Sequence, residues 1–202
     1  HKLSDRKGRV KLVIGAHIDT IPDFKGFMDD ASGVAGMLII SQELKKQKLP
    51  FDVWAVYFGA EENAMFGSKF FVDTLSEKEK ASIKYMIAID GLGFGEKTSL
   101  HAEKDYHPQL EKSFKPIAEQ VVLGDIEGVI DFSDHYYFKL MGIDSCFLEG
   151  SMGAQYYHNN EADKLQDLNV PLSLKSIKAL VNFIQNIDFR SPKIILEKSR
   201  RQ

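Results

Sequence analysis

The sequence contains 202 residues, of which 44% are hydrophobic and 27% charged, and its formal net charge is -3. This composition is typical of a globular domain with its own core, and it carries no basic stripe of the kind that binds nucleic acid. No apolar stretch approaches the roughly 20 residues that cross a bilayer. The single cysteine, Cys146, excludes an internal disulfide and lies in an apolar run that predicts a buried thiol.

The chain begins with His1 rather than Met, and no signal-peptide pattern follows. We therefore expect it to be trimmed at its N-terminus, which leaves the compartment unidentified. The sequence contains no internal repeat, low-complexity tract or linker that would divide it. It predicts one domain over residues 1–202.

Apolar runs rich in β-branched and aromatic residues alternate along the chain with segments of helical spacing. The strands are expected at 10–16, 53–59, 85–89, 98–102 and 145–148, and 1–9 is expected to be an edge strand or a loop. The helices are expected at 32–47, 68–75, 77–82, 108–122, 133–140 and 171–187. This alternation predicts an α/β fold, a three-layer α/β/α sandwich around a largely parallel, mixed central sheet.

The ends and core faces of some helices are also readable. Ser76 and Glu79 form the pattern of a capping box before the helix at 77–82, and Ser133-Asp134 is expected to begin a later helix. Apolar residues at helical spacing define the core faces of the first and last helices. The expected core residues are Val34, Met37, Leu38 and Leu44, and Leu174, Ile177, Leu180, Val181 and Ile184.

Three of the expected strands end in residues of the types that commonly serve as metal ligands, namely His17, the pair Glu61-Glu62, and Asp90. In open α/β sheets ligands bind at the carboxyl ends of the strands, so these groups are expected to converge at one rim. Carboxylates buried together repel one another, and a divalent cation relieves that repulsion. Neighbouring side chains on an extended chain point in opposite directions. One glutamate is therefore expected to hold a metal while the other faces a bound water.

Two short motifs add to this rim. In His17-Ile18-Asp19, Asp19 is expected to accept a hydrogen bond from the imidazole nitrogen that does not face the metal, an arrangement that orients ligating histidines. Asp29-Asp30 stands just before a helix, where aspartate commonly caps the N-terminus. The residues alone leave open whether this pair caps the helix or binds a metal.

Together these motifs resemble the dinuclear-zinc aminopeptidases, metallopeptidase family 28. The resemblance spans roughly residues 10 to 185. It rests, in chain order, on Ala16-His17-Ile18-Asp19, Asp29-Asp30-Ala31-Ser32-Gly33, Ala60-Glu61-Glu62 with Gly67-Ser68, Ile89-Asp90, and Tyr157-His158. The family also contains glutamate carboxypeptidases, glutaminyl cyclases and a non-catalytic receptor ectodomain. The resemblance implies a zinc-peptidase catalytic domain and favours a secreted or periplasmic location.

The resemblance implies five metal ligands. Asp29 would bridge two zinc ions, with His17 and Asp90 completing one site. Glu62 and His158 would complete the other site. Mixed imidazole and carboxylate ligation suits zinc and does not exclude manganese or cobalt. A bridging carboxylate also suits the metal separation of about 3.5–4 Å that two-metal chemistry uses.

The resemblance further implies a hydrolytic reaction with Glu61 as the general base. Bound zinc lowers the pKa of its water to about 7, and Glu61 would pass a proton from that water to the leaving amine. Asp19 would support His17, and Tyr157 would steady the tetrahedral intermediate. A cis peptide bond is expected between Asp29 and Asp30. The expected substrate is a peptide with a free N-terminus.

Two features depart from the family pattern. The family fold begins with a helix and an edge hairpin, whereas only about ten residues precede the first expected strand here. The sheet is therefore expected to lack those edge elements. After His158 the family commonly has Thr and Pro, whereas this chain has Asn159-Asn160.

Other functions of the same fold remain open. A carboxypeptidase would require cationic residues beside the metals, a glutaminyl cyclase would differ around the bridging aspartate, and a non-catalytic binding domain would have lost ligands. The sequence identifies neither the preferred N-terminal side chain of the substrate nor the metal used in the cell nor the oligomeric state.

Several further residues have two interpretations each. Ser133-Asp134-His135 either lines the site, as a similar family segment does, or is a helix N-cap followed by an exposed histidine. His101 and His107 are expected on the surface. Some apolar side chains would either wall a substrate pocket or pack in the core. These are Phe94, Phe132, Tyr136, Met152 and Tyr156.

Overall fold

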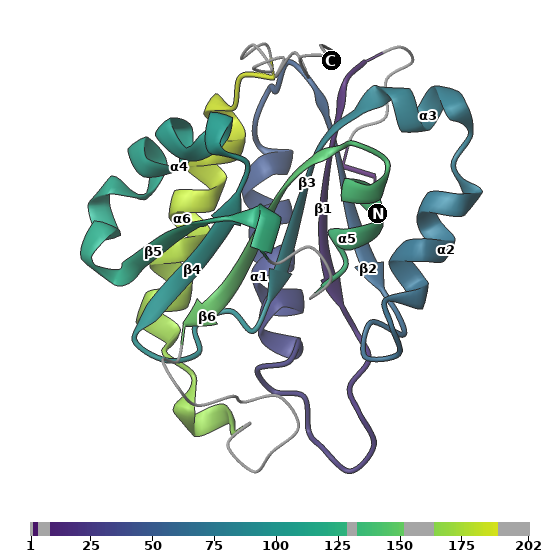
Figure 1. Ribbon diagram of the computed structural model, residues 1–202. Helices are drawn as coiled ribbons and strands as arrows, with labels where there is room; N and C mark the ends of the chain where they lie inside the picture. Colours follow the sequence, from purple (N-terminus) through teal and green to yellow (C-terminus); the bar gives the residue numbers. More distant parts are fainter. Residues whose placement is uncertain (1, 4–8, 129–132, 152–163, 190–202) are drawn as a thin grey trace, which may run out of the picture.

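The described residues of this protein form a mixed, six-stranded sheet. A computed structural model describes residues 2–3, 9–128, 133–151 and 164–189. The strands are β1 (Lys11–His17), β2 (Asp52–Phe58), β3 (Ile83–Asp90), β4 (Lys97–Ala102), β5 (Val121–Asp125) and β6 (Asp144–Ser151). They lie in the order β2-β1-β3-β6-β4-β5 (Figure 1). All neighbouring strands are parallel except β4 and β6, which confirms the largely parallel sheet.

Helices cover both faces of this sheet. The α-helices are α1 (Ala31–Lys45), α2 (Phe66–Thr74), α3 (Glu77–Ser82), α4 (His107–Phe114), α5 (Tyr136–Leu140) and α6 (Val170–Asn186). The short 3-10 helices are η1 (Lys104–Tyr106), η2 (Lys115–Gln120), η3 (Ile126–Gly128) and η4 (Leu165–Asp167). Helices α1, α4 and α6 pack on one face, and α2 and α5 on the other (Figure 1), which confirms the three-layer sandwich. Within the described residues, no helix has both the length and the apolar character needed to cross a membrane.

Alternating side chains of the strands build two apolar cores, one on each face of the sheet. On β1, Leu12 and Ile14 enter the core under α1, α4 and α6, whereas Val13 enters the core under α2 and α5. On β3, Met86 and Ala88 belong to the second core. Because side chains alternate along a strand, later odd positions of β1 and even positions of β3 share the α2 and α5 face.

The capping box expected before α3 is present. The Ser76 hydroxyl accepts a hydrogen bond from the Glu79 N–H, and the Glu79 carboxylate accepts one from the Ser76 N–H at 2.9 Å. These two bonds satisfy donors that the first turn of a helix otherwise leaves without partners. A purely local signal therefore fixes the start of this helix.

The helix expected at 108–122 is too long, and the strand that follows it was not expected. Helix α4 ends at Phe114, and η2 continues only to Gln120. Pro116 offers no N–H to a helix, and Ile117 has a non-helical backbone with φ at -129°. The chain then enters the half-exposed edge strand β5.

Two leucines expected in the core are exposed instead. Leu38 of α1 is 53% exposed, and Leu174 of α6 is 43% exposed. The buried face of α6 includes the small residues Ser173 and Ser176, so this helix packs close to the sheet. The Ser176 hydroxyl lies 2.7 Å from the hydroxyl of Thr98 on β4. The sheet contact of α6 is therefore partly polar, which hydrophobic spacing alone does not reveal.

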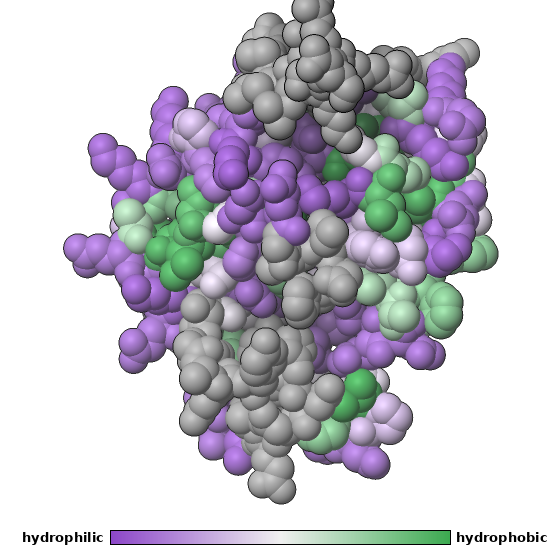
Figure 2. Space-filling view, viewed as in Figure 1, coloured by the Kyte–Doolittle hydropathy of each residue, from purple (hydrophilic) through white to green (hydrophobic). Residues whose placement is uncertain are grey.

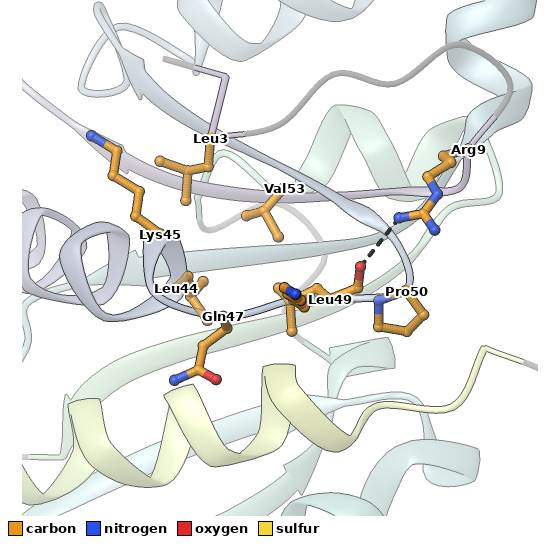
Figure 3. A pocket seen from close by; sticks show the side chains of 9 residues that line it. Leu3, Arg9, Leu44, Lys45, Gln47, Leu49, Pro50 and Val53 are labelled. Carbon is orange, nitrogen blue, oxygen red and sulfur yellow. Dashed lines mark hydrogen bonds between the residues drawn. The ribbon is translucent and has the colours of Figure 1, made fainter.

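The described N-terminal residues pair with the outer edge of β2. The Leu3 N–H donates to the Val53 carbonyl at 3.0 Å. Beside this edge lies a cavity of about 670 Å³ whose wall includes Arg9, and the Arg9 guanidinium donates to the Leu49 carbonyl at 3.2 Å (Figure 3). The cavity lies at the amino ends of β1 and β2. It is therefore remote from the rim where the candidate ligands were expected.

Candidate metal centre

Three ligand-type side chains converge at the carboxyl ends of β1 and β3. His17 ends β1, Asp90 ends β3, and Asp29 lies just before α1. One donor atom from each residue lies within 4.8 Å of the others, and all three residues are buried. His17 Nε2 is 2.9 Å from Asp29 Oδ1 and 3.6 Å from Asp90 Oδ1. The rim predicted from the strand ends therefore brings these three residues together.

The pair Asp29-Asp30 combines both interpretations that the sequence left open. Asp30 is the N-cap of α1, and its Oδ1 accepts a hydrogen bond from the Gly33 N–H at 2.9 Å. Asp29 instead places its carboxylate beside His17. The peptide bond between the two aspartates is cis, as expected. One residue of the pair caps the helix, and the other is a candidate ligand.

Asp30 also joins two strand ends, which sequence reasoning missed. Its Oδ1 accepts from the Gly91 N–H at 3.0 Å, and its Oδ2 accepts from the His17 N–H at 3.2 Å. Burial and the charge of Asp90 raise the pKa of Asp30, whereas the Gly91 N–H acts in the opposite direction. Asp30 thereby fixes the backbone of His17 and of the residue that follows Asp90.

Asp19 supports the rim in a different way from the one expected. The His17 Nδ1–H donates to the backbone carbonyl of Asp19 at 3.0 Å, while the Asp19 carboxylate lies 3.6 Å from Nδ1. That carboxylate instead accepts hydrogen bonds from the N–H groups of Glu61 at 3.0 Å and Glu62 at 3.2 Å. Asp19 therefore orients the imidazole through its carbonyl and holds the glutamate pair through its side chain.

The glutamate pair lies in a turn, so the argument from strand alternation is wrong. Strand β2 ends at Phe58, and Ala60 has a left-handed backbone with φ at 55°. Further on, a Cβ added to Gly67 would lie 2.0 Å from the Gly59 carbonyl oxygen. Only glycine allows the first turn of α2 to approach the end of β2 so closely. The turn, and not an extended strand, sets the directions of Glu61 and Glu62.

Two carboxylates beside the candidate ligands, Glu61 and Asp134, have raised pKa values. Burial, followed by the negative charge of Asp90, raises the pKa of Glu61 to about 9. Burial also raises the pKa of Asp134 to about 7, with Asp90 acting in the same direction and the Ser68 hydroxyl in the opposite one. Both effects disfavour the charged form of a carboxylate. The rim thus gathers more negative charge than His17 alone balances.

The donor atoms at this rim fit a divalent metal such as zinc. The Asp19 carbonyl accepts a hydrogen bond from the His17 Nδ1–H, which leaves Nε2 to face the carboxylates. Within the described part of the chain, His17 Nε2 and Asp90 Oδ1 are buried and make no hydrogen bond. A buried polar atom requires compensation, and imidazole nitrogen with carboxylate oxygen is a common donor set for zinc.

Comparison with known families identifies the chain. The model of one family, described as Peptidase family M28, matches residues 1–184. The chain belongs to peptidase family M28. Aminopeptidase YwaD of Bacillus subtilis (strain 168) is 30% identical to it over 163 residues, which cover 74% of this chain and 35% of YwaD.

Solved structures share the M28 fold of this chain. BSAP, a zinc aminopeptidase from Bacillus subtilis, matches with a TM-score of 0.77 at 20% identity, covering 95% of this chain and 51% of BSAP. A glutaminyl cyclase from Porphyromonas gingivalis matches with a TM-score of 0.71 at 19% identity, covering 87% of this chain and 71% of the cyclase. The chain thus spans about a third of YwaD and about half of BSAP. Since proteins with different reactions share this fold, the choice of reaction must come from the site.

Not every expected M28 site residue joins the cluster. Tyr157 and His158 lie outside the described residues. Glu62 is not part of the group formed by His17, Asp29 and Asp90, although its backbone is held at the rim by the Asp19 carboxylate. The structure therefore brings together three of the five expected ligands, and the metal-binding roles of all five stay predictions.

The weaker sequence assignments have mixed outcomes. His135 is fully buried and its ring stacks on Phe147 at 5.0 Å, so the interpretation as an exposed histidine is wrong. Helix α5 begins only at Tyr136. His107 and His101 are half-buried, so each is only partly exposed at the surface, and His107 Nε2 lies 3.1 Å from two carbonyl oxygens. Phe94 packs in the core with Met28. Phe132, Met152 and Tyr156 lie outside the described residues.

The support that Asp19 gives to the glutamate pair is testable. In the Asp19→Asn variant one carboxylate oxygen becomes an NH₂ group, so one of the two N–H donors loses its acceptor. We expect zinc affinity and kcat/KM to fall about tenfold, the lower end of the effect of removing a supporting partner. Chelator competition and steady-state kinetics measure the two losses. Asp23→Asn, an exposed change in the same loop, is the matched control. Equal behaviour of the two variants would contradict the role of Asp19.

Proposed function

We propose that this chain is the catalytic domain of a zinc aminopeptidase that removes N-terminal residues from peptides. The observation that carries the proposal is the convergence of His17, Asp29 and Asp90 beside a turn that presents Glu61 and Glu62. Membership of peptidase family M28 supports the reaction class. The aminopeptidases among its relatives support cleavage at the N-terminal end of the peptide.

The candidate ligands divide into two zinc sites in this proposal. His17 and Asp90 would hold one ion, Glu62 and His158 the other, and Asp29 both. When bound, the ions supply an electrophile for the peptide carbonyl and a water acidified towards neutral pH. The Asp19 carbonyl holds the imidazole of His17 in the tautomer that leaves Nε2 for a metal.

Glu61 holds and moves the proton in this proposal. Its carboxylate accepts a proton from the attacking water and delivers it to the nitrogen of the leaving amine. The Asp19 carboxylate fixes the backbone N–H of Glu61, which keeps this base beside the ligands. Positive charge at the rim favours the ionised form of Glu61 and opposes the burial that raises its pKa. Tyr157, outside the described residues, is assigned to steadying the tetrahedral intermediate.

Metal removal tests the proposal on the full chain. Dialysis against a zinc chelator is expected to lower hydrolysis of leucine p-nitroanilide by at least about 100-fold, and added zinc is expected to restore it, because the metal would acidify the attacking water and polarise the carbonyl. Elemental analysis of the active protein is expected to give two zinc ions per chain. N-acetyl-leucine p-nitroanilide, which lacks the free amine, is the matched control substrate and is expected to remain uncut.

The same assay separates the alternatives. Pyroglutamate formation from a peptide that begins with glutamine would identify a glutaminyl cyclase. Release of a C-terminal acidic residue would identify a carboxypeptidase. Less than one bound metal per chain under saturating zinc, together with no turnover, would indicate a binding domain. Any of these outcomes would overturn the aminopeptidase proposal.

A further inference from the structure

A carboxylate outside the metal cluster lies on the same face of the sheet as the candidate ligands. Glu149 of β6 is the register partner of Asp90 on β3. Phe147 and Ala88, two residues earlier on each strand, both enter the core under α2 and α5. Alternation therefore places Asp90 and Glu149 on that face, with Glu149 about one strand spacing of 4.8 Å beyond Asp90.

The surroundings of Glu149 hold it in place without pairing it with a lysine or arginine. Its Oε1 lies 3.3 Å from His101 Nε2 on β4, and the side chains are 29% and 19% exposed. His101 stacks on Phe147 with ring centroids 6.1 Å apart, and a Cβ on Gly124 of β5 would lie 2.9 Å from His101 Nδ1. The imidazole is thus confined between Phe147 and the backbone of β5. His101 is the only cation-forming group of the described residues within 4.0 Å of Glu149.

This arrangement leaves Glu149 with capacity for another donor. A carboxylate offers about four acceptor positions, and the contact with His101 Nε2 at 3.3 Å involves Oε1 alone. Glu149 is also not part of the cluster of His17, Asp29 and Asp90, so it is free of a ligand role there. Lys97 lies on the same face of β4, opposite Ser151, but its ammonium is not within 4.0 Å of Glu149. Figure 2 shows this side of the molecule, with apolar areas over β5 and over α2.

We propose that Glu149, positioned by His101, recognises a cationic side chain on the N-terminal residue of the substrate, so that the enzyme prefers lysine and arginine at that position. The inference rests on the proposed aminopeptidase function. Glu149 lies about one strand spacing from Asp90, so it is near the first residue of a substrate whose scissile bond lies at His17 and Asp90. The α-amino group is common to all these substrates, so only a contact between Glu149 and the side chain creates a preference among N-terminal residues. A charge-assisted bond from ammonium or guanidinium to a half-buried carboxylate then selects the basic residues.

Kinetics with the zinc-loaded full chain test this inference. The p-nitroanilides of lysine, arginine, leucine and glutamate are compared in wild type and Glu149→Gln. We expect the variant to lose about tenfold in kcat/KM for lysine and arginine, the effect of one charge-assisted hydrogen bond, and less than about twofold for leucine. Glu149→Lys is expected to prefer glutamate. Glu77→Gln removes one exposed carboxylate from α3, at the opposite end of the sheet, and is the matched control.

Binding of free amino acids gives a readout that does not require turnover. Calorimetric titration of the wild type is expected to show tighter binding of L-lysine than of L-leucine, and Glu149→Gln is expected to remove that difference. An equal loss for lysine and leucine substrates, or no loss for either, would overturn the inference. If no substrate is cleaved by any variant, the aminopeptidase proposal fails, and the calorimetric difference alone then decides the role of Glu149.

Discussion

The Glu61→Gln variant is expected to keep its zinc and lose about 10³-fold in kcat/KM. An amide of the same shape cannot accept the proton of the attacking water, and general base catalysis of this kind contributes about 10²- to 10⁴-fold. The backbone hydrogen bond from Glu61 to Asp19 is retained because it uses the main-chain N–H. The turn should therefore keep its shape. Steady-state kinetics and elemental analysis on the same preparation measure the two quantities.

Its neighbour provides the matched control. Glu62→Gln makes the same chemical change one residue away, and the Glu62 backbone is held by the same carboxylate. If Glu62 is a ligand and Glu61 is not, the substituted amide offers no anionic oxygen to the metal, and the variant is expected to bind less zinc as well as to lose activity. Zinc loss in Glu61→Gln with full zinc retention in Glu62→Gln would indicate that Glu61 is the ligand and Glu62 the base. Full activity in Glu61→Gln would remove the general base from the proposal.

The fold was predictable where one physical signal dominates. The apolar, β-branched runs that form β1, β2 and β3 are buried on both faces of the sheet, so their composition alone identifies them. Strand β5 is only half-buried, and its apolar run is limited to Val121-Val122-Leu123 before Gly124, so its first two residues were taken as the end of a helix. The prediction that Leu174 is buried was wrong because the buried side chains of α6 are those on the face that meets the sheet, and Leu174 lies outside that face.

The candidate site was predictable at the ends of the strands and not in its supporting contacts. His17 and Asp90 follow buried strands directly, so the topology brings them together. Asp30 and Asp19 act on groups far away in the sequence, since Asp30 bonds to Gly91 and Asp19 bonds to Glu61 and Glu62. No spacing rule connects such positions. The one local signal was the N-cap preference of aspartate, which identified part of the role of the Asp29-Asp30 pair.

The Asp30→Ala variant is expected to have the largest effect on stability, with a loss of about 3 kcal/mol in the free energy of unfolding. The carboxylate of Asp30 is 1% exposed and accepts the N–H groups of His17, Gly33 and Gly91. Alanine leaves these buried donors without an acceptor, and each unsatisfied donor costs about 1–3 kcal/mol of stability. A water molecule that enters the space left by the carboxylate would accept some of these hydrogen bonds and reduce the loss. Denaturant unfolding of the metal-free protein measures the loss. In Asp30→Asn the amide oxygen can still accept from Gly33 and Gly91, so an intermediate loss is expected.

Comparison with another helix cap separates capping from the support of the site. Ser76→Ala removes the exposed serine hydroxyl that caps α3. It is expected to lower the free energy of unfolding by about 1 kcal/mol without changing zinc affinity. Asp30→Ala is expected to weaken zinc binding by about 10- to 100-fold as well, because the backbones at His17 and Gly91 lose their common partner. Equal losses of stability in the two variants, with unchanged zinc affinity, would reduce Asp30 to an ordinary N-cap. The expected inequality would show that one buried carboxylate couples the start of α1 to the ends of β1 and β3, and so couples the folding of the sheet to the geometry of the metal centre.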